Sequence, residues 1–273
     1  MSSAADQTPA PASRVETGQA APTPAAGGAG LLVAVVAGAV LTAAVAGLAA
    51  TYDSVSESDG LTRIDRPVLA WMVAHRTPAL NTIITWFTDI GGPTLLPIIA
   101  TVVTVLLAWR WRSWTPVALM VVATAGSLAM TTAGKEFTGR IRPDQSLAVP
   151  PFETSPSFPS GHALNSTVIV IVLSYLMVLH VRSRRARTWT VIGLFVYAVL
   201  MGLSRVFLGH HWFTDVLAGW TAGAAWAVAL IMAHRLLLAI QRRRHAQQAE
   251  PGRDDPSVTV RPAAADRGGR SAF

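Results

Sequence analysis

Six long runs of uncharged, apolar residues constrain the fold of this chain more than any other feature of its sequence. They cover residues 31–51, 93–109, 115–134, 161–181, 189–208 and 213–234. A helix needs about 20 such residues to cross a hydrocarbon core about 30 Å thick. The run 93–109 is short, but residues 83–90 can extend it. The sequence therefore predicts an all-α, multi-pass membrane protein with six transmembrane helices.

The composition agrees with lipid as the main solvent of the chain. Only 14% of the 273 residues are charged and 51% are hydrophobic, whereas an average soluble domain has about 25% charged residues. A soluble domain with so few charges could not cover its surface with polar groups. The sequence also contains no cysteine, which excludes disulfides, thiolate metal sites and a cysteine nucleophile.

Two terminal segments lack the apolar periodicity of the rest. Residues 1–29 are rich in Ala, Pro, Ser, Thr and Gly, and residues 242–273 are rich in Arg and then polar. Neither buries enough apolar surface to offset the entropy of ordering, so we expect disordered tails around a domain of residues 30–241. The run 31–51 is longer than the apolar region of a signal peptide and only Arg14 precedes it, which favours a retained helix.

A shorter amphipathic segment covers residues 64–76. Ile64, Val68, Trp71 and Met72 follow the spacing i, i+4, i+7, i+8 of one helical face. This pattern predicts a helix that lies on the membrane surface. A helix buried outside the membrane is the alternative.

Arginines gather in alternate connections between the apolar runs, which predicts the orientation of the chain. Arginine-rich connections stay in the cytoplasm, so both termini are expected to be cytoplasmic and the connections 52–92, 135–160 and 205–212 to be extracytoplasmic. The inverted topology would translocate ten arginines, namely Arg110, Arg112, Arg182, Arg184, Arg185, Arg187, Arg235, Arg242, Arg243 and Arg244. The net charge of +7 then reflects topology, and no nucleic-acid partner is expected because no nucleic-acid-binding motif accompanies it.

Three polar blocks in or beside the outward connections are not explained by hydropathy. They read Lys135-x6-Arg142-Pro143, Pro159-Ser160-Gly161-His162 and Ser204-Arg205-x5-His211-x3-Asp215. Lys135, Arg142 and Arg205 would place three cations at one membrane face, where guanidinium groups bind phosphate oxygens in pairs. The alternative for each cation is an interfacial side chain that reaches for water.

The second block begins an apolar helix with a serine and a glycine. Ser160 is a natural N-cap, and the free N–H groups at a helix start attract anions. Gly161 lets a ligand approach the backbone closely. The pair therefore predicts a phosphate cradle, with simple helix capping as the alternative.

Three imidazole groups and one carboxylate accompany these cations. His211 and Asp215 are four residues apart, which on a helix places them on one face. The carboxylate would fix the histidine tautomer and leave the other nitrogen free as a nucleophile, unless the pair only stabilises the helix. His162 suits the general acid that protonates a leaving alkoxide. His210 is expected to point about 100° away from His211 on a helix and receives no role.

A metal site is the competing interpretation of these residues. No second carboxylate lies at ligand spacing near His211, and three cations would repel a divalent ion. We therefore expect metal-independent phosphoryl transfer without a cofactor, in which the cations stabilise the charge on the phosphoryl oxygens.

Together the blocks resemble the motifs KxxxxxxRP, PSGH and SRxxxxxHxxxD of the type 2 phosphatidic acid phosphatase (PAP2) superfamily, and every fixed position is met. The resemblance implies that His211 forms a phosphohistidine, Asp215 orients it and His162 protonates the leaving group. It also implies that Lys135, Arg142, Ser160, Gly161 and Arg205 bind the phosphoryl group. Vanadium-dependent haloperoxidases have a similar pocket but not this density of membrane spans.

The expected substrate is a membrane lipid phosphate or diphosphate, because its tail can stay in the bilayer while its head enters the cation cluster. Polyprenyl diphosphate, phosphatidylglycerol phosphate and phosphatidate all fit, in a bacterial cell membrane. One alternative is a lipid phosphotransferase with the same phosphohistidine. Another is a non-catalytic lipid-binding membrane protein, which should have lost a motif residue. The sequence leaves the oligomeric state open.

Overall fold

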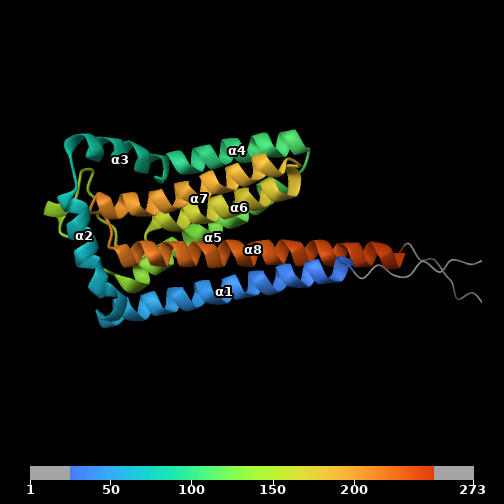
Figure 1. Cartoon of the computed structure of the whole chain (residues 1–273), viewed down its shortest axis with the longest axis horizontal. Coiled ribbons are helices and arrows are strands. Elements are labelled where there is room, and N and C mark those ends of the chain that lie inside the picture. The colour runs from blue at the N-terminus through green and yellow to red at the C-terminus, as the bar shows by residue number, and fades with distance from the viewer. Residues whose placement is uncertain (1–24, 249–273) are drawn as a thin grey trace, which may run out of the picture.

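The computed structural model describes residues 25–248, and within that range the chain is helical with no strand (Figure 1). The all-α prediction is confirmed. Its helices are α1 (Ala25–Glu57), α2 (Asp65–Ala74), α3 (Pro78–Ile90), α4 (Leu95–Trp111), α5 (Thr115–Thr138), α6 (Gly161–His180), α7 (Arg184–Phe207) and α8 (Phe213–Gln248), with short 3₁₀ turns η1 (Gly60–Ile64) and η2 (Gln145–Leu147).

The helices include enough long apolar segments for a multi-pass membrane protein. Five of them, α1, α5, α6, α7 and α8, are long and apolar enough to cross a bilayer. The pair α3 and α4 meets the same test together and is bent by 49° between its two halves. Counting the bent pair as one span gives six, in agreement with the sequence.

The bend between α3 and α4 has a clear local cause. Pro93 has no N–H to continue a helix, and Gly91 lies so close to α7 that a Cβ there would be 2.4 Å from the sulfur of Met201. The predicted extension of this span over residues 83–90 is therefore a separate helix. That helix begins at Pro78, where the Thr77 hydroxyl accepts a hydrogen bond from the Leu80 N–H at 3.2 Å.

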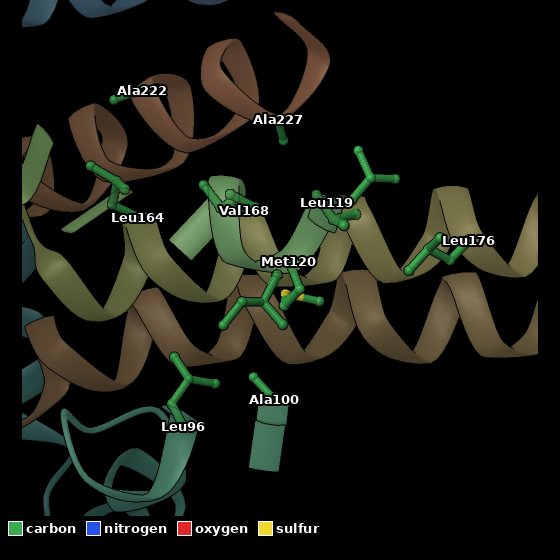
Figure 2. Packing of buried hydrophobic residues seen from close by; sticks show 12 residues of the cluster. Leu96, Ala100, Leu119, Met120, Leu164, Val168, Leu176, Ala222 and Ala227 are labelled. Atoms are coloured by element: carbon green, nitrogen blue, oxygen red, sulfur yellow. The ribbon is translucent and has the colours of Figure 1, made fainter. Parts of the chain in front are cut away.

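The core of the bundle is organised around α6, which packs against α5, α7 and α8. Leu164, Val168, Val172 and Leu176 form a fully buried stripe along α6 at four-residue intervals. Figure 2 labels Leu164, Val168 and Leu176 of this stripe. Residues on the outer faces of the bundle are equally apolar yet exposed, such as Phe195 at 64%. This pattern is typical of helices surrounded by lipid rather than water.

Close contact between α6 and α8 sets the position of their first turns. A Cβ at Gly219 would be 2.8 Å from the Ser160 carbonyl oxygen, and one at Gly223 would be 2.8 Å from the Leu164 carbonyl oxygen. Small residues at such positions let membrane helices approach closely. The approach brings the start of α8 directly beside the start of α6.

The amphipathic segment forms α2, which lies across one end of the bundle (Figure 1). Val68 and Met72 pack inward against residues of α6, α7 and α8, but Trp71 is 58% exposed. Ile64 belongs to the preceding turn η1. The four residues therefore do not share one face toward the membrane. The first turn of α2 faces the bundle instead, where the carboxylate of Asp65 is buried.

The N-terminal end of α1 and the C-terminal end of α8 both lie at the end of the bundle opposite to α2 (Figure 1). Residues 25–29 and 242–248 are helical, so the predicted tails are shorter than the sequence indicated. Arginine, alanine and glutamine favour a helix over residues 242–248. The remaining predicted tail residues, 1–24 and 249–273, lie outside the described residues.

Candidate active site

The three sequence blocks meet at the end of the bundle that α2 crosses. The connection between α5 and α6 supplies Arg142, the turn between α7 and α8 supplies His211, and the first turn of α6 supplies His162. The arginine-rich connections lie at the other end of the same helices.

His211 is 1% exposed and lies in the turn that precedes α8. Its Nδ1 is 3.4 Å from Asp215 Oδ2, and its Nε2 is 3.2 Å from Arg142 Nη1. The expectation that both residues share a helix is wrong in detail, since α8 begins at Phe213. The side chains still meet because the turn folds back over the first turn of α8.

The environment of His211 favours its neutral form. Burial lowers the pKa of His211 well below its usual value, and the positive charges of Arg142 and Arg205 lower it further. A neutral imidazole whose Nδ1 faces a carboxylate carries its proton on that nitrogen. The lone pair of Nε2 then points toward Arg142, where an anion would bind.

A glycine makes the turn before α8 possible. Gly209 has a φ of +75°, and a Cβ there would be 2.3 Å from the Leu147 carbonyl oxygen. Only glycine adopts this conformation without strain. His210 follows in the same turn, not on a helix as expected, and its Nε2 lies 2.7 Å from the Val149 carbonyl oxygen.

The carboxylate of Asp215 is fully buried and has several partners. Its Oδ2 accepts hydrogen bonds from the Ser157 hydroxyl at 2.5 Å and from the Trp212 N–H at 2.9 Å. Its Oδ1 accepts from Arg140 Nη1 at 2.5 Å. Ser157 and Arg140 were not expected in the site, although Arg140 stands only two residues before the motif arginine Arg142.

Two of the three predicted cations are joined by an acid that sequence analysis gave no role. Glu153 Oε2 accepts from Arg142 Nη2 at 2.8 Å, and its Oε1 accepts from Arg205 Nη2. Burial alone would raise the pKa of Glu153, but the charges of Arg205 and then Arg142 outweigh it, so the pKa is lowered. Glu153 is therefore an anion bound between two arginines.

The third cation, Lys135, comes from the last turn of α5. Its Nζ donates to the Ser155 hydroxyl and to the Pro156 carbonyl, both at 2.7 Å. Arg142 Nε donates to the carbonyl of the same Ser155 at 2.7 Å. The structure thus brings all three predicted cations to one segment, residues 153–156.

Ser160 occupies the predicted N-cap position of α6 but makes no side-chain capping bond. Its hydroxyl is buried without a hydrogen-bond partner, while its N–H donates to the Asp215 carbonyl at 3.0 Å. Gly161 follows with little space around it, since a Cβ there would be 3.1 Å from Thr131 Cγ2. Ser160 therefore holds the N-cap position without accepting a hydrogen bond from the helix, and its hydroxyl remains available to a ligand.

His162 lines a pocket of about 160 Å³ together with Thr88, Asp89, Glu153 and Arg205. A Cβ at Gly92, in the break between α3 and α4, would be 3.8 Å from His162 Nε2. Thr88 also accepts a hydrogen bond from Arg205 Nη1 at 3.2 Å. The bend between α3 and α4 therefore forms one wall of the site, which the sequence did not indicate.

Between residues 25 and 248 no three or more His, Cys, Asp or Glu side chains are grouped so that they could hold a metal ion. The cluster that does form contains the His211–Asp215 pair, His162 and three cations, two of which share the Glu153 carboxylate. Its composition suits an anion.

Comparison with known proteins places the chain in a family. Residues 116–238 match the family model of the PAP2 superfamily. Over 163 residues the chain is 34% identical to phosphatidylglycerophosphatase B of Bacillus subtilis, an alignment that covers 58% of this chain and 77% of that protein. The chain belongs to the PAP2 superfamily. It is a multi-pass membrane phosphatase of the PAP2 type.

Further relatives agree with this assignment. The chain is 31% identical over 109 residues to an undecaprenyl-diphosphatase of Sulfolobus acidocaldarius, covering 38% of this chain and 48% of that protein. The crystal structure of a transmembrane PAP2-type phosphatidylglycerolphosphate phosphatase from Bacillus subtilis superposes with a TM-score of 0.64 at 26% identity, over 70% of this chain and 96% of that one. Aquifex aeolicus LpxE shares the fold, with a TM-score of 0.50 at 22% identity over 62% of this chain and 95% of that one.

Proposed function

We propose that this PAP2 phosphatase hydrolyses the phosphate or diphosphate monoester of a membrane lipid through a phosphohistidine at His211. One observation carries the proposal. The buried His211 directs Nδ1 to the Asp215 carboxylate and Nε2 to the Arg142 guanidinium, so its nucleophilic nitrogen faces the place where a phosphoryl group would bind.

In the first step the lipid phosphate replaces the Glu153 carboxylate between Arg142 and Arg205, with Lys135, Ser160 and the Gly161 N–H as further ligands. His211 Nε2 forms a bond to phosphorus while the bond from phosphorus to the leaving oxygen breaks. His162 gives its proton to that oxygen, so the lipid leaves as an alcohol, or as a monophosphate when the substrate is a diphosphate. The cations stabilise the charge on the phosphoryl oxygens.

In the second step water attacks the phosphohistidine. Its oxygen forms a bond to phosphorus, the Nε2–P bond breaks and His162 takes the water proton. Asp215 keeps the Nδ1 proton of His211 in place through both steps. Inorganic phosphate and the original protonation states are restored.

Two observations support a lipid as the substrate. The site lies at the end of a bundle with apolar outer faces, where the tail of a lipid can remain in the bilayer. A second pocket of about 400 Å³ lies between α1, α5, α6 and α8, and its lining is almost wholly apolar, with Tyr52, Phe137, Phe158 and Leu164 among its residues. Pro159, the residue before Ser160, is also part of its lining.

The arginine-rich connections support an orientation in which the site faces out of the cytoplasm. They lie at the end of the bundle opposite to the site, together with the ends of α1 and α8. The positive-inside rule places that end in the cytoplasm of a bacterial cell. Both termini are then cytoplasmic and the active site is extracytoplasmic.

The test measures phosphate release by purified protein in detergent with EDTA present. Phosphatidylglycerol phosphate, phosphatidate and a polyprenyl diphosphate are the substrates. We expect release from at least one of them and its loss in His211→Ala, whereas His75→Ala, which changes an exposed histidine of the same bundle end, should retain it. Full activity of His211→Ala would overturn the mechanism. Phosphorylation of an added alcohol in preference to water would instead identify a phosphotransferase.

A further inference from the structure

We propose that Arg140 and Asp65 are positioning residues for phosphoryl transfer, which hold the Asp215 carboxylate so that its Oδ2 faces His211 Nδ1. The inference rests on the proposed function, because it assigns a role in the same reaction. Neither residue belongs to the fixed positions of the three motifs.

Arg140 determines which oxygen of Asp215 is left for His211. Its Nη1 donates to Asp215 Oδ1 at 2.5 Å and to the Thr214 hydroxyl at 2.8 Å. With Oδ1 bound in this way, Oδ2 is the oxygen that faces His211 Nδ1, the Ser157 hydroxyl and the Trp212 N–H. By binding Oδ1, the guanidinium fixes the rotation of the carboxylate and leaves Oδ2 toward His211.

Asp65 in turn fixes Arg140. Its Oδ2 accepts from Arg140 Nη2 at 2.7 Å and from the Thr214 hydroxyl at 2.7 Å, and its Oδ1 accepts from the Thr214 N–H at 2.8 Å. Asp65 therefore binds both the arginine and a free N–H in the first turn of α8. A negative charge at this position also stabilises the positive end of the helix.

The charges in this cluster suit the proposed reaction. The side chains are 3% exposed for Asp65, 14% for Arg140 and 0% for Asp215. With a neutral His211 the three charges sum to −1, so the cluster retains one negative charge beside the nucleophile. Attack on phosphorus places a positive charge on the imidazole that keeps its Nδ1 proton, and the cluster then becomes neutral. Without Asp65 the charge of Asp215 would already be balanced by Arg140 before the reaction.

The position of Asp65 in the chain adds a structural consequence. It is the first residue of α2, the helix across the end of the bundle, and lies outside the residues that match the family model. The connection between α1 and α3 therefore contributes to the geometry of the catalytic carboxylate. A helix expected only to rest on the membrane surface becomes part of the support of the site.

The experiment determines kcat and KM for Asp65→Asn, Arg140→Ala and Arg140→Lys on a lipid that the parent protein hydrolyses. Rates are divided by the concentration of sites that bind vanadate, so that misfolded protein is not counted. We expect kcat to fall about 100-fold in Asp65→Asn and Arg140→Ala with little change in KM, since a displacement of about 1 Å can have this effect. Arg140→Lys, which keeps the charge but not the fork, should recover part of the rate.

A double variant tests whether Asp65 acts through Arg140. In the Arg140→Ala variant, the further change Asp65→Asn should lower kcat by a much smaller factor than it does in the parent protein. The effects of two residues that act through the same contact are not additive. Thr214→Val is a milder change for the case in which the charged variants fail to fold. It removes the hydroxyl that both residues share and should lower kcat by a smaller factor.

Arg63 offers a matched control for these variants. Arg63→Ala removes an exposed arginine that pairs with Asp59 in the neighbouring turn η1, and it should leave kcat unchanged. The positioning role is wrong if kcat per vanadate-binding site stays at the parent value in Asp65→Asn, or if the whole loss appears in KM. A parent protein that binds vanadate but releases phosphate from no lipid would overturn the proposed function, and the inference with it.

Discussion

Replacing Glu153 with glutamine should strengthen the binding of inorganic phosphate. The Glu153 carboxylate occupies the space between Arg142 and Arg205, which is where the proposed substrate binds. A phosphate group must therefore displace it. Glutamine has nearly the same shape but no charge, so it competes less well for the two guanidinium groups.

The structure sets the size of the effect. Two unit charges 4 Å apart interact by about 4 kcal/mol at an effective dielectric constant of about 20. Glu153 is 31% exposed while its partners Arg142 and Arg205 are 12% and 3% exposed, so water weakens the interaction and desolvation opposes it. We expect a net change of about 1–2 kcal/mol, which corresponds to a roughly five- to thirty-fold lower inhibition constant for phosphate.

The same substitution should lower the stability of the ligand-free protein. Arg205 is left buried without a carboxylate, and removing one partner of a buried pair is destabilising. Phosphate at about 100 times its dissociation constant should return about 2.7 kcal/mol of stability. At equal phosphate concentration Glu153→Gln is closer to saturation because it binds phosphate more tightly, so its melting temperature should rise more than that of the parent protein.

The assay follows the lipid product at increasing concentrations of inorganic phosphate, together with thermal unfolding in detergent. Glu136→Gln is the matched control, because it removes an exposed carboxylate of the α5 end that makes no ion pair among residues 25–248. The control should leave both quantities unchanged. An inhibition constant for phosphate that is unchanged or higher in Glu153→Gln would refute the reasoning.

Three further predictions concern the nucleophile, the turn that carries it and the orientation of the chain. The lowered pKa of His211 means that its imidazole stays neutral as the pH falls through 6.5, so nitrogen NMR of selectively labelled protein should show no protonation there, and a midpoint near 6.5 would contradict the assigned environment. Gly209→Ala should destabilise the protein by at least about 1–2 kcal/mol and reduce phosphate release, whereas Gly193→Ala, at a glycine with open space around it, should not; equal melting temperatures would show that the turn tolerates a side chain. A cysteine at Thr154 should react with a membrane-impermeant thiol reagent on intact cells, and reaction only after lysis would invert the topology.

The spans and the motif blocks could be predicted from the sequence because their signals are local. A run of about 20 apolar residues specifies a membrane helix without reference to the rest of the chain. Lys135, Arg142, His162 and His211 stand out because hydropathy gives no reason for them. The structure brings all of them to one end of the bundle, while their roles in the reaction remain proposals.

The supporting residues could not be predicted because their contacts are distant in sequence. Asp65 reaches Thr214 across 149 positions and Arg140 reaches Asp215 across 75. Asp65 also stands at the end of a polar connection that contains several acids and hydroxyl groups. Such a sequence is typical of a segment exposed to water. Only the packing of α2 across the bundle end shows that its first carboxylate is buried.

Local geometry explains the remaining differences from expectation. The sequence placed His210 and His211 on a helix, but the positive φ of Gly209 begins a turn that ends only at Phe213. Glu153 received no role from the sequence, because the two arginines that it joins come from different parts of the chain. Ser160 met the sequence signal for a cap, yet its hydroxyl is free.

The most direct test of the central claim is to trap the reaction and locate the phosphoryl group. The parent protein is mixed with a radiolabelled lipid phosphate, quenched within milliseconds in base, digested and analysed by mass spectrometry. We predict a phosphoryl group on His211 that survives base and is lost in acid, and no label in His211→Ala. A protein that turns over the lipid while no enzyme-bound phosphate forms, or that carries the label on another residue, would contradict the account.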